Sequence, residues 1–246
     1  MPHTLLLRLE APMQSWGIES RFEYRETMLE PTFSGVIGLC CAALGRDRHE
    51  PVNDLTEALQ MAVRVDRQGF LQEDFHTAMD VITANGSVKP TQLSYRWYLH
   101  NASFLVGLQS ADAALLHLLH QALLNPHWLL FLGRKSCPPT YPVVTQESFR
   151  EGMMISEAFI SEPLRLYKPR KDFHLRIIAD IRLAEQLRDQ NYLEVAQYTR
   201  NDVPISFAKR VFTTRMVTEF EQKISRTILK DCYQTEEYEG EEEIES

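Results

Sequence analysis

The chain has 246 residues, 44% of them hydrophobic and 10% aromatic, enough to bury a core in one large domain or two small ones. No apolar run is long enough to span a membrane, and the apolar start, broken by Arg8, is too short for a secretory signal. We therefore expect a cytoplasmic protein with no membrane contact. None of the four cysteines has zinc-site spacing, so we also expect no metal and no cofactor.

The formal net charge of −8 is concentrated at the C-terminal end. Eight of the 34 acidic residues lie between Asp231 and Glu245, and all 26 Lys and Arg residues precede Asp231. Residues 1–230 are therefore electrically neutral, with 26 residues of each sign. We predict that residues 231–246 form a disordered acidic tail and that any nucleic acid is bound through a local basic patch.

The first half of the sequence predicts strands and helices around one apolar core. Spacing and turn signals give a strand at residues 4–9, a buried helix from Thr32 or Ser34 to Gly45, a short helix at 52–59, a strand at 61–65, strands at 75–83 and 91–99, a strand at 102–108, a helix at 111–124 and a strand at 128–132. Turn signals at residues 85–86 and 89–90 favour a hairpin that projects from the body at about residues 74–99. Without the hairpin, this is the β-α-β-β-α-β order of a ferredoxin-like domain, which RNA-recognition modules share.

The second half predicts a smaller β-rich lobe. Candidate strands lie at residues 142–144, 158–161, 164–167, 174–179 and 210–218, and a candidate helix at 183–197. We therefore expect an α+β protein with a ferredoxin-like domain at 1–145, a C-terminal lobe at 146–230 and the acidic tail at 231–246.

No enzyme signature stands out in the sequence: it lacks a Gly-rich phosphate loop, a His-Glu-x-x-His motif and a nucleophile elbow. His76, beside a Lys or Tyr, could cleave RNA without a metal by acid–base chemistry at a 2′-hydroxyl. The alternative is a hairpin histidine that stacks or forms hydrogen bonds.

Basic residues interleaved with aromatic ones are more frequent, and they suit single-stranded RNA because cations bind phosphates and flat rings stack on unpaired bases. The alternative for each group is an ordinary half-exposed strand or turn. The groups are Arg21, Phe22, Tyr24 and Arg25; Tyr95, Arg96, Trp97 and Tyr98; Arg134 and Lys135; and Arg165, Tyr167, Lys168, Arg170, Lys171 and Phe173.

Several of these segments resemble the CasD family, the fifth-numbered CRISPR-associated protein of the type I-E Cascade complex. The resemblance rests on residues 6–17 (LLRLEAPMQSWG) and 31–39 (PTFSGVIGL), and on the later segments 74–77 (DFHT), 95–99 (YRWYL) and 132–138 (LGRKSCP) in the same order. It extends over roughly residues 4–145. The acidic tail departs from the family pattern.

The resemblance implies a repeat-associated (RAMP) protein, with a ferredoxin-like domain and a protruding thumb, that holds the 5′ handle of a CRISPR RNA. Such a subunit caps the backbone filament of CasC-like subunits. It also contacts a CasA-like large subunit that reads target DNA. Catalysis is not implied, although a related subtype uses a family member as its processing nuclease, so an endoribonuclease centred on His76 remains the alternative function.

The predicted RNA contacts follow from these motifs. Residues 14–17 and 32–35 would form hydrogen bonds to the handle, and the helix N-terminus near Thr32 would favour a phosphate. Arg96 and Tyr98 would stack on splayed bases, and the 132–139 loop would bind phosphate. The full set is Gln14, Ser15, Trp16, Arg21, Arg25, Thr32, Ser34, Gly35, His76, Arg96, Tyr98, Arg134 and Lys135.

Overall fold

A computed structural model describes residues 1–17, 23–165, 173–190 and 192–224. Its centre is an antiparallel seven-stranded sheet in the order β10-β11-β9-β4-β7-β1-β8. The strands are β1 (His3–Glu10), β4 (Gln60–Arg67), β7 (Ser103–Ser110), β8 (Phe149–Arg150), β9 (Phe173–Asp180), β10 (Leu193–Ser206) and β11 (Val211–Ile224). The chain is therefore a mixed α+β protein built on antiparallel pairing.

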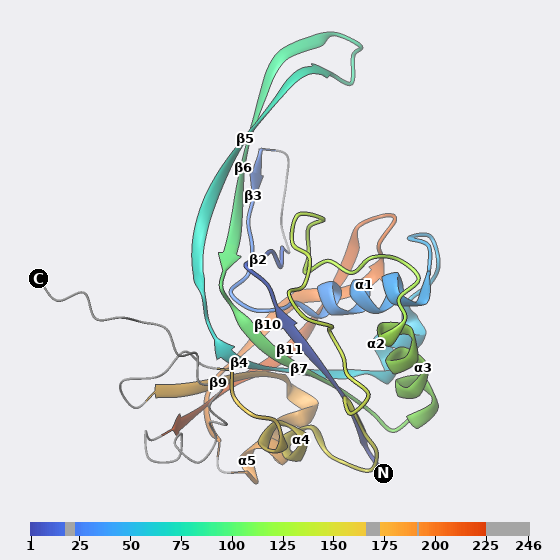
Figure 1. Cartoon of the computed structure of the whole chain (residues 1–246), viewed down its shortest axis with the longest axis vertical. Coiled ribbons are helices and arrows are strands. Elements are labelled where there is room, and N and C mark those ends of the chain that lie inside the picture. The colour runs from blue at the N-terminus through green and yellow to red at the C-terminus, as the bar shows by residue number, and fades with distance from the viewer. Residues whose placement is uncertain (18–22, 166–172, 191, 225–246) are drawn as a thin grey trace, which may run out of the picture.

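The sheet buries both of its faces, each under its own helices (Figure 1). Along β1 the side chains alternate, so Leu5 and Leu7 join one core while Leu6 joins the other. The larger core lies under α1 (Phe33–Leu44), α2 (Asn53–Ala58) and α3 (Ala113–Leu124). The smaller core lies under α4 (Ile155–Ser161), a 3-10 turn (Ile181–Leu183) and α5 (Ala184–Arg188).

The prediction of a strand at residues 128–132 is wrong, because this stretch is irregular in the structure. The edge of β1 is taken instead by a later segment, where Leu6 N–H donates to the Ser148 carbonyl at 2.9 Å and Arg8 N–H donates to the Val143 carbonyl at 2.8 Å. Trp128 N–H donates to the Ala42 carbonyl at 3.2 Å, so this stretch satisfies the C-terminal carbonyls of α1 rather than a strand.

Four predictions for the second half also differ from the structure. Residues 158–161 belong to α4, and the helix predicted at 183–197 ends at Arg188, after which β10 begins. Residues 142–144 form no strand, and of the strand predicted at 164–167 the described part, 164–165, is irregular. The strands predicted at 174–179 and 210–218 lie largely within β9 and β11.

A long hairpin of β5 (Phe70–Ile82) and β6 (Val88–His100) projects from the body and curves over it (Figure 1). It extends further than the 75–83 and 91–99 pair expected from the sequence. At its base, β6 also pairs with β2 (Met13–Gln14) and with β3 (Tyr24–Arg25), which tie the hairpin to the N-terminal segment.

The division of the chain at residue 145 stays a prediction, and the strands on either side of it lie in one sheet. The tail at 231–246 lies outside the described residues. Within the described residues, none of the helices has the length and apolar character needed to cross a membrane.

Candidate nucleic-acid interface

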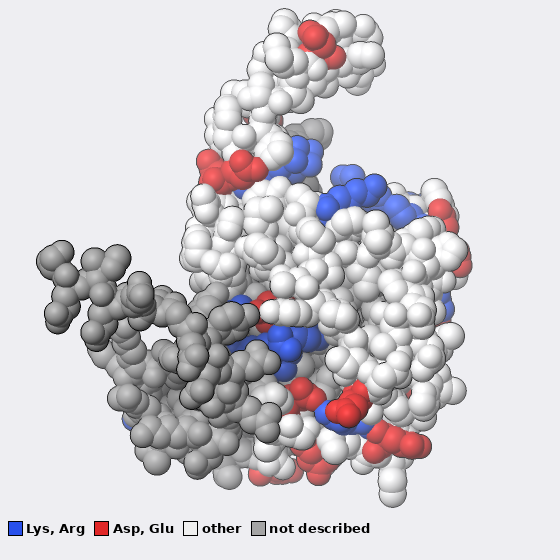
Figure 2. Space-filling model, in the orientation of Figure 1, with Lys and Arg blue, Asp and Glu red and all other residues white. Residues whose placement is uncertain are grey.

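An open groove of about 530 Å³ lies between the base of the hairpin, the start of α1 and the turn that joins β10 to β11. It is lined by Arg25, Arg48, Arg134 and Arg210, and no acidic residue is among its described lining residues. Figure 2 shows Lys and Arg side chains gathered on both sides of the gap between the hairpin and the body. The groove brings together seven of the predicted residues: Ser15, Trp16, Arg25, Thr32, Ser34, Gly35 and Arg134.

The loop at residues 132–139 reaches the groove because Gly133, which has no side chain, allows the loop backbone to lie against the backbone of Ser15. Ser15 N–H donates to the Leu132 carbonyl at 3.0 Å, and a Cβ atom on Gly133 would lie 1.7 Å from the Ser15 carbonyl oxygen. Gly133 also has a φ of +97°, which disfavours other residues. Cys137 is buried beneath the loop, and burial raises the pKa of its thiol. The loop is thus held rigidly.

Arg134 fastens this loop to the hairpin base. Its Nη1 donates to the Trp97 carbonyl at 3.1 Å, and its Nη2 donates to the Arg25 carbonyl at 2.8 Å. Its guanidinium lies 4.7 Å from the centre of the Tyr98 ring. Arg134 therefore has a structural role as well as a charge in the groove, whereas its neighbour Lys135 is exposed.

Tyr98 does not present a free ring. It is 2% exposed, Arg134 lies over its face, and its hydroxyl is 3.3 Å from Ser136 Oγ. In this structure the predicted base-stacking face of Tyr98 is already covered by a side chain of the protein.

Trp16 lines the groove, whereas Gln14 is fully buried and is not among the lining residues, and the side-chain polar groups of both are hydrogen-bonded within the protein. Gln14 Nε2 donates to the Ala102 carbonyl at 2.9 Å, and Gln14 Oε1 accepts from Trp16 Nε1 at 3.0 Å. The Trp16 ring lies so close to Gly35 that a Cβ atom there would be 2.8 Å from Trp16 Cε3. Both side chains are buried, so the polar atoms expected to meet RNA are engaged within the protein.

The N-terminus of α1 holds a carboxylate where we expected a phosphate. Thr32 caps the helix by accepting from Gly35 N–H at 3.2 Å, and Asp202 of β10 accepts from Phe33 N–H at 2.9 Å. Asp202 is fully buried and also pairs with Arg215 at 2.8 Å. Two N–H groups of this helix terminus are therefore used within the protein, one of them to hold the β10–β11 hairpin in place, and phosphate binding at the terminus stays a prediction.

The contact between the β10–β11 hairpin and the start of α1 brings into the groove residues that the sequence analysis did not predict. Arg48 Nη2 donates to the Phe207 carbonyl at 3.1 Å, and Ala208 N–H donates to the Arg48 carbonyl at 3.1 Å. Arg210 is exposed in the same turn, next to Phe212. The adjacent cations at residues 209–210 are a usable signal, but the sequence pattern predicts residue 210 as the first residue of a strand.

A second hollow of about 640 Å³ lies along the concave side of the hairpin and shares Arg25 with the groove. Arg25 pairs with Arg96 in the β3–β6 ladder, and Arg96 Nε donates to Ser94 Oγ at 3.2 Å. On the opposite side of the same strands, the Tyr24 and Tyr95 rings stack 5.2 Å apart. Strand alternation therefore places Arg25 and Arg96 on one face of the hairpin base and the Tyr24 and Tyr95 rings on the other.

His76 is exposed on the hairpin, and its Nε2 lies 2.7 Å from Asp74 Oδ2. No hydrogen bond joins it to a described Lys or Tyr, so the partner that the nuclease alternative requires is not in place among the described residues. Arg21, also predicted to bind RNA, lies outside them.

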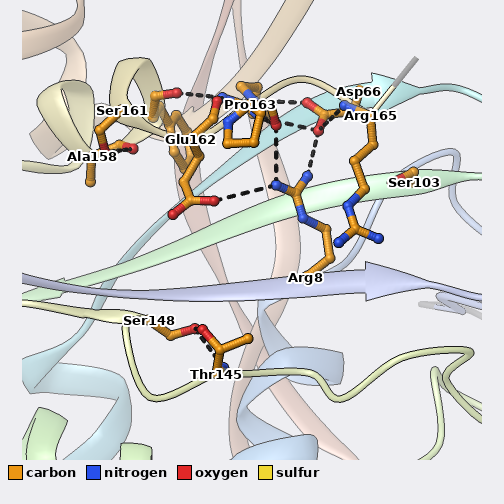
Figure 3. Close-up of polar contacts among 12 residues, drawn as sticks. Arg8, Asp66, Ser103, Thr145, Ser148, Ala158, Ser161, Glu162, Pro163 and Arg165 are labelled. Carbon is orange, nitrogen blue, oxygen red and sulfur yellow. Dashed lines mark hydrogen bonds and ion pairs between the residues drawn. The ribbon is translucent and has the colours of Figure 1, made fainter. Parts of the chain in front are cut away.

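Another group of cations lies on the far side of β1, and it is neutralised internally (Figure 3). Arg8 Nη1 pairs with Asp66 at 2.5 Å, Arg64 pairs with Asp66 at 2.7 Å, and Arg165 lies 3.5 Å from Glu10. Burial lowers the pKa of the Arg8 guanidinium, and the Asp66 carboxylate opposes that shift. In contrast, none of the four groove arginines forms an ion pair with a described residue.

Comparison with known proteins shows the family of the chain. A family model described as CRISPR-associated protein (Cas_Cas5) matches residues 4–218. The chain belongs to this Cas5 family. It is similar to the CRISPR system Cascade subunit CasD of Escherichia coli (strain K12), with 36% identity over 154 residues that cover 56% of this chain and 68% of that protein.

Two solved structures are similar to this Cas5-family chain. A chain of a CRISPR RNA-guided surveillance complex is 29% identical with a TM-score of 0.71, and the match covers 92% of each chain. A Cas protein crystal structure is 37% identical with a TM-score of 0.64, covering 92% of this chain and 97% of that one. The family match includes every groove residue but not the acidic residues 231–246.

Proposed function

We propose that this protein is a non-catalytic, RNA-binding subunit of a Cascade-type surveillance complex and that the groove holds the 5′ handle of a CRISPR RNA. One observation carries the proposal: four arginines without acidic partners line a groove whose described residues include no acid. Such a surface attracts phosphates, although the body as a whole is neutral. The relatives named above, a Cascade subunit and part of an RNA-guided complex, support the same reading.

Within the groove, the proposed contacts divide into two kinds. Arg25, Arg48 and Arg210 are exposed and would bind phosphates, with Lys135 at the margin. Phe207 and Phe212, whose ring centres lie 6.4 Å apart edge to face, would offer ring surface to an unpaired base.

We further propose that the β5–β6 hairpin is the thumb of the family and that β1, α1, β4, β7 and α3 form its ferredoxin-like half. The order β4-β7-β1 in the sheet agrees with the ferredoxin-like arrangement of the first three strands. The exposed aromatic face of the hairpin, with Tyr24 at 61% and Phe75 at 54% exposure, would contact a CasC-like backbone subunit. A CasA-like large subunit would be the other neighbour and would link this chain to target DNA.

Incubation of the purified protein with repeat RNA in EDTA tests the proposal. We expect binding without cleavage, and we expect Arg48→Ala with Arg210→Ala to weaken it at least tenfold. Arg188→Ala is the matched control, because Arg188 lies on α5 and pairs with Glu194 away from the groove. Equal weakening by the control would mean that general charge, and not the groove, binds the RNA.

The second candidate is a metal-independent endoribonuclease, favoured by the pairing of His76 with Asp74, since a carboxylate can orient a catalytic imidazole. RNA cleavage in EDTA that His76→Ala abolishes would establish this candidate and overturn the non-catalytic role.

A further inference from the structure

We propose that the basic groove also accepts an acidic peptide, and that this peptide is the C-terminal acidic segment of the chain itself, residues 231–246. The segment would occupy the groove when RNA is absent and yield it to the handle. This inference rests on the proposed function for its biological meaning, but contact between the segment and the groove does not require RNA and can be measured alone.

Charge complementarity is the first argument. Residues 231–246 hold eight acidic residues and no Lys or Arg, and they account for the entire net charge of the chain. The groove offers four arginines without acidic partners among the described residues. Carboxylates bind guanidinium groups in the same forked geometry that phosphates use, so one set of arginines suits both ligands.

The second argument concerns which arginines lack an acidic partner among the described residues. The other arginine group, around Arg8, already has Asp66 and Glu162 as partners and offers less to an added carboxylate (Figure 3). Tyr233 and Tyr238 lie among the acidic residues of the segment, and Phe207 and Phe212 lie among the arginines of the groove. A peptide that combines carboxylates and rings resembles single-stranded nucleic acid in both respects.

The third argument is reach. The groove lies at the start of β11, beside Arg210 and Phe212, and the described chain ends at Ile224, the other end of that strand. A strand of this length spans about 43 Å. Twelve extended residues cover about 41 Å, which brings the chain from Ile224 to Glu236, where the dense acidic block begins. All residues after Ile224, 225–246, together reach about 75 Å when extended, and like charges favour extension.

The functional consequence is a higher affinity threshold for every ligand of the groove. If the tethered segment binds with a Kd about tenfold below its effective concentration, which is on the order of 1 mM, it weakens each groove ligand roughly tenfold. A handle that has base contacts as well as phosphate contacts then stays bound at concentrations at which an RNA held only through its phosphates is released.

The first experiment contains no RNA. A fluorescent peptide of residues 231–246 is titrated, at low salt, against a full-length variant in which Asp231 is replaced by Asn and the seven later Glu residues by Gln. We expect the peptide to bind this variant about tenfold more tightly than it binds the parent, whose own segment competes. Adding Arg48→Gln and Arg210→Gln should abolish the binding, whereas Arg188→Gln should not. No binding to the neutralised variant, or binding indifferent to the groove substitutions, would overturn the inference.

The second experiment measures affinity for a poly-uridine RNA without the handle sequence. We expect a gain of five- to tenfold in the neutralised variant. A variant lacking residues 226–235 retains seven acidic residues but leaves only about 41 Å of extended chain after Ile224, so its acids stop short of the groove. It should behave like the neutralised variant if contact matters. If it behaves like the parent, net charge alone explains the effect. If the peptide binds the groove but no RNA does, the proposed function fails and the contact stands.

Discussion

Replacement of Arg134 by Ala should loosen the base of the hairpin, although the residue lies in a loop. The substitution removes two hydrogen bonds to carbonyls of different segments, at 3.1 Å to Trp97 and 2.8 Å to Arg25, and the contact with the Tyr98 ring. Each charged hydrogen bond contributes about 1.5–3 kcal/mol when well buried, and the cation–π contact about 0.5–2 kcal/mol. Because part of the site is open to solvent, we expect a loss of about 2–4 kcal/mol in the free energy of unfolding.

For a chain of this size, such a loss lowers the Tm by about 5–15 °C. Thermal unfolding followed by circular dichroism measures it, and hydrogen exchange should show faster exchange at the amides of β3 and at the base of β6. Lys135→Ala, an exposed neighbour, should change stability by less than about 0.5 kcal/mol. A Tm for Arg134→Ala within 1 °C of the parent would refute the structural role of this arginine.

Three further predictions concern Gly133 and Asp202, which fix the walls of the groove, and the buried thiols of α1. Gly133→Ala should cost at least about 2 kcal/mol, because its Cβ would meet the Ser15 carbonyl and its φ is +97°; urea unfolding measures the loss, and an unchanged midpoint contradicts it. Asp202→Ala should cost about 3–5 kcal/mol by leaving Arg215 buried without its partner, and Arg215→Met in the same chain should recover part of the loss; additive losses would contradict the pairing. Burial raises the pKa of Cys40 to about 12 and of Cys41 to about 11, so both stay protonated at pH 8 and should react with thiol reagents only after unfolding; rapid labelling of either in the native protein, located by mass spectrometry, would contradict this.

The sequence predicted much of the groove because its residues come from turns with strong local signals. Thr32 before an apolar run and Gly133 before two cations each fix a turn, and the structure brings both turns together at the groove. What the sequence did not reveal was which polar groups would be used internally. Gln14 looks like a ligand-binding residue until the Ala102 carbonyl, far along the chain, is placed beside it.

The wrong fold predictions arise where a short apolar run is compatible with both the helical period of 3.6 residues and the strand period of 2 residues. Residues 158–161 are too few to separate a helix from a strand, and the outcome is decided by α4 packing on the sheet, where a Cβ on Gly107 would lie 2.4 Å from Ile155 Cδ1. Leu183 and Leu187 fit a helix, but Leu193 continues the pattern only by chance, because pairing with β11 makes it a strand residue. Long-range pairing of this kind leaves no local signal, and for the same reason Arg210 was not predicted to face the groove.

The most direct test of the central claim is a map of photo-cross-links between the protein and a handle RNA that carries 4-thiouridine, read by mass spectrometry. The groove model predicts cross-links in peptides that contain Arg25, Arg48, residues 133–135 and residues 207–212. A separate pocket of about 270 Å³ is lined by Arg8, Tyr141 and Arg165, and cross-links confined to that pocket would contradict the model.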